Sequence, residues 1–166
     1  YTQLQSTFGV INLCLVDGIP KVVNMKDMLS HFIEFRHDVV LRRTQFELRN
    51  AEARMHILEG FRIALDNLDE VIATIRASKT PPEANTALQE KFGLSEIQAK
   101  AILDMRLQRL TGMELEKIEE EYRELLKTIE RLRELVARRE LRMEVVKNET
   151  IELGEKYGDK RRTSII

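Results

Sequence analysis

The sequence has one cysteine, no tryptophan and no long apolar run, and these features exclude some classes of protein. Cys14 is the only cysteine among the 166 residues, so no disulfide can form within the chain, which fits a reducing compartment. No stretch of 18 consecutive apolar residues is present, so we expect no membrane-spanning helix and no membrane partner. Together these absences predict a cytoplasmic protein.

Proline, glycine and net charge are also sparse. Three prolines and seven glycines leave few forced turns, while 33% of the residues are charged and 43% are hydrophobic. This mixture is typical of long helices with solvated outer faces. Because 27 basic side chains are balanced by 28 acidic ones, no overall field draws the chain onto nucleic acid, and any basic patch must be local.

The first structured segment is rich in β-formers. Residues 10–16 form a strand candidate, Asp17 and Gly18 supply turn residues that tolerate positive φ, and residues 21–23 return as a second strand. A lone hairpin is marginal in water, so we expect it to join a sheet formed by other residues. Because the chain also begins at Tyr1 and not at methionine, we interpret it as a piece of a larger protein.

A long helical pattern follows the hairpin. It begins with Asn24, with Asp27 three residues later as in a capping box, and runs to about Ser78 with Gly60 as its only glycine. Its apolar positions recur at threes, fours and one seven, and they are Phe46, Ala53, Ile57, Phe61, Ala64, Leu68, Val71 and Ile75. We expect this face to form the outgoing half of a coiled-coil seam.

Two short capped helices come next. Thr80 is the N-cap of the first, which Gly93 ends. Ser95 and Gln98 form the capping box of the second, and a helix break is expected near residues 110–112. These two helices predict a small head at the end of the arm.

The returning helix has the clearest repeat. Its apolar residues alternate threes and fours, which is the 3.5-residue repeat of a coiled-coil seam, and they are Leu115, Ile118, Tyr122, Leu125, Ile129, Leu132 and Val136. The pattern loosens near residues 136–139, where we expect a break. A final helix runs from about Glu140 to Tyr157, where Gly158 stops it.

These elements predict a mainly α fold, with a long antiparallel coiled-coil arm, a small helical globular tip and a short β-hairpin at the N-terminal base. The expected domains are residues 1–36 as the end of a preceding domain, 37–79 as the outgoing arm, 80–112 as the globular tip, 113–157 as the returning arm with a base helix, and 158–166 as an exit linker.

No residue pattern indicates catalysis. His31, His37 and His56 lack metal-ligand spacing, and Cys14 alternates with apolar neighbours as an inert buried thiol does. Tyr122 occupies a seam position, where packing explains it. We therefore expect no catalytic residue, no metal ligand and no cofactor in this chain.

The main basic segment is residues 36–49. Its candidates for reaching DNA phosphates, through contacts that weaken with salt, are Arg36, Arg42, Arg43 and Arg49. Asp38 and Glu47 interleave with them, so a solvated helix face is the alternative, and composition alone favours it.

Residues 95–114, SEIQAKAILDMRLQRLTGME, hold more apolar residues than one stripe needs. At about 100° per residue they divide into two sets, Ile97, Ala101, Ile102 and Met105 against Ala99, Leu103, Leu107 and Leu110. A helix with two apolar stripes must bury both, within one chain or against another. The pattern leaves the neighbouring short helix and another chain open as partners of the second stripe, and the small size of the head favours another chain. The candidates for such an interface between chains are Ile97, Ala101, Ile102, Met105 and Leu110.

Three separated segments carry a family resemblance. RRTQFELRNAEARMHILEG (residues 42–60), IQAKAILDMRLQRLTGMELEKI (97–118) and YGDKRRTSI (157–165) resemble the A subunits of bacterial DNA gyrase, in the same order. The similarity covers essentially the whole chain. The A subunit of topoisomerase IV is close kin, and these residues do not separate the two.

The resemblance implies a place in a type IIA DNA topoisomerase, which cuts one duplex, passes another through it and reseals the break. In that family this segment is the end of the tower domain, the coiled coil and the exit gate (C-gate), where two A subunits form a homodimer. The partners implied are the ATPase B subunit, in an A2B2 assembly, and double-stranded DNA. ATP and Mg2+ belong to the B subunit, and the cleaving tyrosine belongs to another segment, so this chain alone is expected to be inactive. Residues 35–37 and 136–139 are expected to serve as hinges.

Two other functions stay open on the residues alone. A nucleic-acid-binding helical arm predicts salt-sensitive contacts through the four arginines. A structural coiled-coil spacer predicts a seam used between chains instead of within one.

Overall fold

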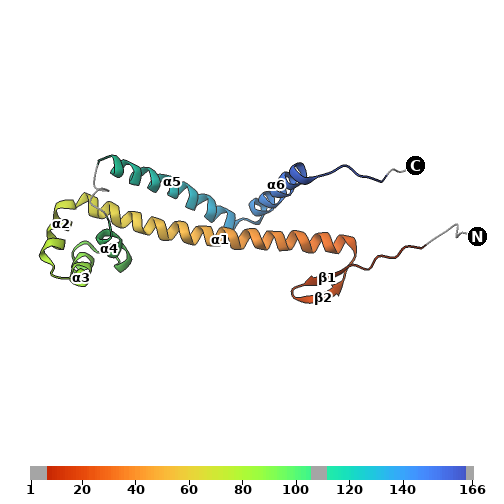
Figure 1. Cartoon of the computed structure of the whole chain (residues 1–166), viewed down its shortest axis with the longest axis horizontal. Coiled ribbons are helices and arrows are strands. Elements are labelled where there is room, and N and C mark those ends of the chain that lie inside the picture. Colours follow the sequence, from red (N-terminus) through yellow and green to blue (C-terminus); the bar gives the residue numbers. More distant parts are fainter. Residues whose placement is uncertain (1–6, 106–111, 164–166) are drawn as a thin grey trace, which may run out of the picture. The chain divides into compact units, whose positions relative to one another are not determined.

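The computed structural model describes residues 7–105 and 112–163, without the side chains of residues 112–114. Within these residues the chain forms a β-hairpin followed by helices, so the mainly α fold and the N-terminal hairpin are confirmed (Figure 1). The chain divides into two compact units, a terminal unit of residues 1–43 with 138–166 and a central unit of residues 44–137. Among the described residues, no helix is long and apolar enough to cross a membrane.

The hairpin consists of β1 (Leu13–Val16) and β2 (Ile19–Val22), which pair antiparallel. Asp17 and Gly18 join them with φ angles of 53° and 78°, as a two-residue type I′ turn requires. The backbone N–H of Val23 donates to the carbonyl of Asn12 at 3.0 Å, and ladder bonds alternate from there. Pro20 therefore lies at a pair without ladder bonds, where its missing N–H breaks none.

Helix α1 (Met25–Asp66) begins where the side chain of Asn24 accepts the N–H of Asp27 at 2.8 Å. The helix runs without interruption through residues 35–37, so the break expected there is wrong. It ends earlier than the sequence indicates, because Asn67 interrupts the helical pattern. The Asn67 side chain donates to the carbonyl of Ile63, which competes with continuation of the helix.

Three shorter helices follow α1 in the central unit. They are α2 (Leu68–Ala77), α3 (Pro81–Phe92) and α4 (Glu96–Leu103), and α3 packs against both of the others (Figure 1). The predicted N-cap at Thr80 and C-cap at Gly93 are confirmed, since Thr80 accepts the N–H of Glu83 and Gly93 has a φ of 66°. The two caps place the ends of α3 where sequence alone put them.

One apolar cluster holds these helices together. Its buried members are Leu58, Phe61 and Ala64 of α1, Val71 of α2, Leu88 of α3, Leu94, and Ala99 and Ile102 of α4. Helix α5 (Gly112–Ala137) adds Ile118, Tyr122 and Leu125 to the cluster. Burial of this apolar surface is the main stabilising term for the central unit.

Helix α5 pairs antiparallel with α1 in the central unit (Figure 1). Arg62 of α1 lies over the ring of Tyr122, and Glu52, earlier in α1, pairs with Arg133, later in α5, at 2.7 Å. The seam predicted on α5 is confirmed, because the stripe from Leu115 to Val136 is half-buried or buried throughout, most completely at Ile129 and Leu132.

The seam predicted on α1 is wrong in its first half. Phe46 is 57% exposed and Ala53 is also exposed. Ile57 is half-buried as predicted, but the regular buried or half-buried stripe instead comprises Thr44, Leu48, Ala51, Met55 and Leu58, again at threes and fours. Thr44, a polar residue that is buried, concealed this register, and the larger Phe46 suggested the wrong one.

Helix α6 (Arg139–Tyr157) lies in the terminal unit. It is separated from α5 by Arg138, whose backbone is extended at φ −111° and ψ 115°, so the break predicted near residues 136–139 is confirmed. Val40 of α1 and Val146 of α6 are the buried aliphatic residues on the two helices of this unit. Ion pairs also join the two helices, as between Arg36 and Glu149.

Candidate functional site

Helix α4 holds most of the predicted dimer-interface residues, and the structure separates them. Ile97 is 63% exposed, while Ile102 is 4% exposed and belongs to the chain's own core. Ala101 and Met105 are half-buried against that core. Leu110 lies outside the described residues. The side chain of Ile102 is therefore removed from the predicted contact surface.

The division of this helix into two apolar stripes is also corrected. Gln98, Ala99 and Ile102 are all buried, and at about 100° per residue they form a single arc of the helix. Gln98, 6% exposed, lies at one edge of this arc. Ile102 and Ala99, which the sequence alone assigned to different stripes, lie only about 60° apart around the helix. The arc has half-buried flanks at Ala101 and Leu103, and Ile97 projects from the opposite side.

The buried Gln98 is accommodated by hydrogen bonds to α1 and to its own helix. Its Oε1 accepts the N–H of Ser95 at 2.9 Å, and its Nε2 donates to the backbone carbonyl of His56 at 2.7 Å. Ser95 Oγ accepts the N–H of Gln98 and lies 2.7 Å from His56 Nε2. The capping box predicted at Ser95 is confirmed, and it is also a contact between α4 and α1.

Gly60 makes this close contact possible. A Cβ atom at Gly60 would lie 2.7 Å from both Cβ and Cγ of Gln98, closer than non-bonded carbon atoms approach. His56 and Gly60 are one turn apart on the same face of α1. The sequence contained one signal for this site, because Gly60 is the only glycine inside the long helical pattern.

A cavity of about 220 Å³ lies between α1 and α5 in the central unit. Leu58 and Leu65 of α1 and Leu115 and Ile118 of α5 form its apolar walls. The Arg62 guanidinium lies 5.7 Å from the centroid of the Tyr122 ring, a distance that fits a cation–π contact. Tyr122 therefore packs as the seam position predicts.

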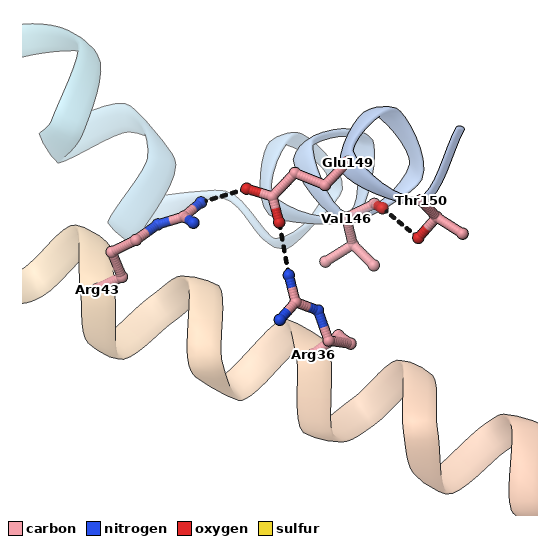
Figure 2. Close-up of polar contacts among 5 residues, drawn as sticks. All are labelled: Arg36, Arg43, Val146, Glu149 and Thr150. Carbon is pink, nitrogen blue, oxygen red and sulfur yellow. Dashed lines mark hydrogen bonds and ion pairs between the residues drawn. The ribbon is translucent and has the colours of Figure 1, made fainter. Parts of the chain in front are cut away.

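Three of the four arginines proposed for DNA form ion pairs within the chain. Glu149 of α6 binds two of them, Arg36 at 2.7 Å and Arg43 at 2.6 Å, as Figure 2 shows. Arg42 pairs with Asp38 one turn away at 2.8 Å. Arg49 is exposed and has no ion pair among the described residues.

The two guanidinium groups change the acidity of Glu149. The hydrogen bond from Arg43 is the largest cause that lowers the pKa of this carboxyl, and the charges of Arg43 and Arg36 act in the same direction against partial burial. The carboxylate is therefore ionised over a wider pH range than an ordinary glutamate. Figure 2 also shows Thr150 donating to the carbonyl of Val146, one turn back in α6.

Two of the three histidines, His37 and His56, have structural partners. His37 Nε2 accepts from Nε of the buried Arg142 at 3.0 Å, a bond that requires the neutral imidazole. His56 takes part in the α4 contact. Within the part of the chain that the structure describes, no group of histidine, cysteine, aspartate and glutamate is arranged to hold a metal ion.

Comparison with known proteins gives consistent matches. The family model for the A subunits of DNA gyrase and topoisomerase IV matches residues 1–150. The chain is 54% identical over 165 residues to the DNA gyrase A subunit of Clostridium acetobutylicum, covering 99% of this chain and 20% of that protein. It is 54% identical over 164 residues to that of Halalkalibacterium halodurans, with 99% and 20% covered, and 52% identical over 164 residues to that of Staphylococcus epidermidis, with 99% and 18% covered. The chain thus spans about a fifth of the length of these relatives.

Proposed function

The chain belongs to the family of DNA gyrase and topoisomerase IV A subunits, and from this membership we propose that it forms the coiled-coil arm and C-gate of a gyrase-like type IIA topoisomerase. In this role two copies meet through the α2–α4 end of the central unit. The gate holds the enzyme together while DNA is cut and then releases the transported duplex. ATP and Mg2+ act on the B subunit of an A2B2 assembly, and this chain contributes no catalytic residue.

The exposure of Ile97 carries this proposal. It is a large apolar side chain, 63% exposed, on a helix whose other apolar residues are buried or half-buried. Burying an isoleucine side chain contributes about 1.5–3 kcal/mol to the free energy of association. In a two-fold symmetric dimer both copies bury this side chain, so the contribution is made twice. Ala101 and Met105, which are half-buried, belong to the same proposed surface. Leu110, the remaining candidate, lies outside the described residues.

The α5 seam argues against a spacer whose seam is shared between chains. Ile129 and Leu132 are 5% and 3% exposed within a single chain, so a second copy has little left to cover there. A nucleic-acid-binding arm is also less favoured, because Arg42 is paired with Asp38, and Arg36 and Arg43 are held by the carboxylate of Glu149. We propose Arg49 as the remaining DNA-proximal candidate of the four.

Sedimentation equilibrium of the 166-residue chain at tens of micromolar tests the gate. We expect a dimer, and we expect Ile97→Glu to give monomers with unchanged helicity, because a carboxylate cannot be buried cheaply at the contact. Ile151→Glu, on an exposed position of α6, is the matched control and should leave the dimer intact. A monomeric wild-type chain at these concentrations contradicts the proposal.

A further inference from the structure

The polar contacts at the start of α4 do more than cap that helix. With eight residues, α4 is too short to be stable in water by itself, so its orientation depends on what anchors it. Ser95 and Gln98 satisfy each other's backbone N–H groups, as any capping box does. Both side chains also contact His56 of α1 at 2.7 Å, so the cap is at the same time the attachment.

Because Gln98 is buried, its hydrogen bonds fix the rotation of α4 about the helix axis. Gln98 is 6% exposed, and both ends of its amide are bonded, Oε1 to Ser95 and Nε2 to His56. Turning α4 about its axis breaks these bonds and leaves buried polar groups without partners, which is strongly unfavourable. The approach is also fixed in distance, because Gly60 has no side chain to keep Gln98 away.

The orientation of α4 determines which residue faces outward. Successive residues of a helix project about 100° apart, so a Gln98 held against α1 places Ile97 to one side of the contact, where it is exposed. Ala99 and Ile102, on the other side, enter the core. The exposure of Ile97 is therefore a consequence of the contacts made by its neighbours.

We propose that His56, Ser95 and Gln98 form a clasp that positions α4 so that Ile97 is presented to a second copy of the chain. The inference rests on the proposed function, because the clasp acts through the dimer contact. Its three members are positioning residues and do not themselves touch the partner.

The test removes the clasp and measures dimerisation. Gln98→Leu keeps the size of the side chain and removes its hydrogen bonds, while Gln89→Leu makes the same change on α3, where the Gln89 side chain donates to Asn85 one turn away in the same helix. Ser95→Gly is a milder second variant, because glycine is tolerated as an N-cap yet has no Oγ to meet His56. We expect the dimer dissociation constant to rise at least about tenfold in Gln98→Leu and Ser95→Gly, and to stay unchanged in Gln89→Leu.

Two further readouts separate positioning from general loss of structure. Helicity measured by circular dichroism should stay close to that of the wild-type chain, although the dimer weakens. Cross-linking between copies through Ile97→Cys, in a Cys14→Ser background, should become slower when Gln98→Leu is added, because Ile97 is no longer held in one direction.

The possible results distinguish the two proposals. A wild-type chain that is monomeric overturns the gate itself. A wild-type chain that dimerises, with Gln98→Leu and Ser95→Gly dimerising equally well, overturns the clasp and leaves the gate standing. Equal weakening by the Gln89→Leu control also overturns the clasp.

Discussion

Gly60 is the residue on which the approach of α4 to α1 depends most directly. Any side chain there meets Gln98 at once, so we expect Gly60→Leu to destabilise the chain by about 1–3 kcal/mol, the usual cost of overpacking. Gly154→Leu is the matched control, because a Cβ at that helical glycine has no neighbour within 4 Å. There the change should be neutral or stabilising by up to about 1 kcal/mol. Urea denaturation measures both, and equal effects of the two substitutions contradict this explanation of Gly60.

Residues with local partners were predictable from sequence, and residues with distant partners were not. The caps at Thr80 and Ser95 depend on residues three positions away, so a short motif identifies them. His56 and Gln98 are separated by 42 residues, and nothing in the sequence brings them together. Ile102 was assigned to the wrong surface because it lies only about 60° from Ala99 around the helix, so the two apparent stripes share one buried arc.

Among the elements, the pairing of α5 with α1 gives the clearest contrast between expectation and structure. We expect Leu132→Ala to destabilise the central unit by about 2–5 kcal/mol, because it opens a cavity at a buried position of the seam. Phe46→Ala, at a position that the sequence also assigned to the seam, should change stability by no more than about 0.5 kcal/mol. Thermal denaturation followed by circular dichroism measures both. A large loss from Phe46→Ala restores the seam predicted from sequence.

The two helices differed in predictability for a physical reason. Every seam position of α5 is apolar or aromatic, so periodicity alone gives its buried face. The buried face of α1 contains Thr44 and the small Ala51, while Phe46 lies outside it. Hydrophobicity alone predicts that Phe46 is buried and Thr44 is exposed, which is the reverse of what the structure shows. The buried face of α1 is set by its packing against α5.

At the scale of the whole molecule, the two units are held by different forces. The central unit has a continuous apolar cluster that draws residues from α1, α2, α3 and α4. The terminal unit buries few aliphatic side chains and has charged contacts between α1 and α6, namely Glu149 with Arg36 and Arg43, and Glu34 with Arg139. The central unit has ion pairs between helices as well, but they accompany its apolar cluster. Ion pairs respond to pH and apolar burial does not, so acid should affect the units unequally.

The lowered pKa of Glu149 determines the direction in which pH changes the stability of the terminal unit. Its pKa is lowered in the folded chain, so its contribution to stability is complete above the unfolded value of about 4.3 and is lost as the pH falls through the lowered folded value. Hydrogen exchange of α6 amides should therefore accelerate in acid before exchange in the cluster of α1 and α4 does. Glu149→Gln should bring fast exchange of α6 to neutral pH, since the amide keeps the shape but not the charge. Glu152→Gln, on an exposed residue of α6 without an ion pair among the described residues, should leave the profile unchanged. If α6 and α4 lose protection together in acid, the terminal unit does not depend on this carboxylate.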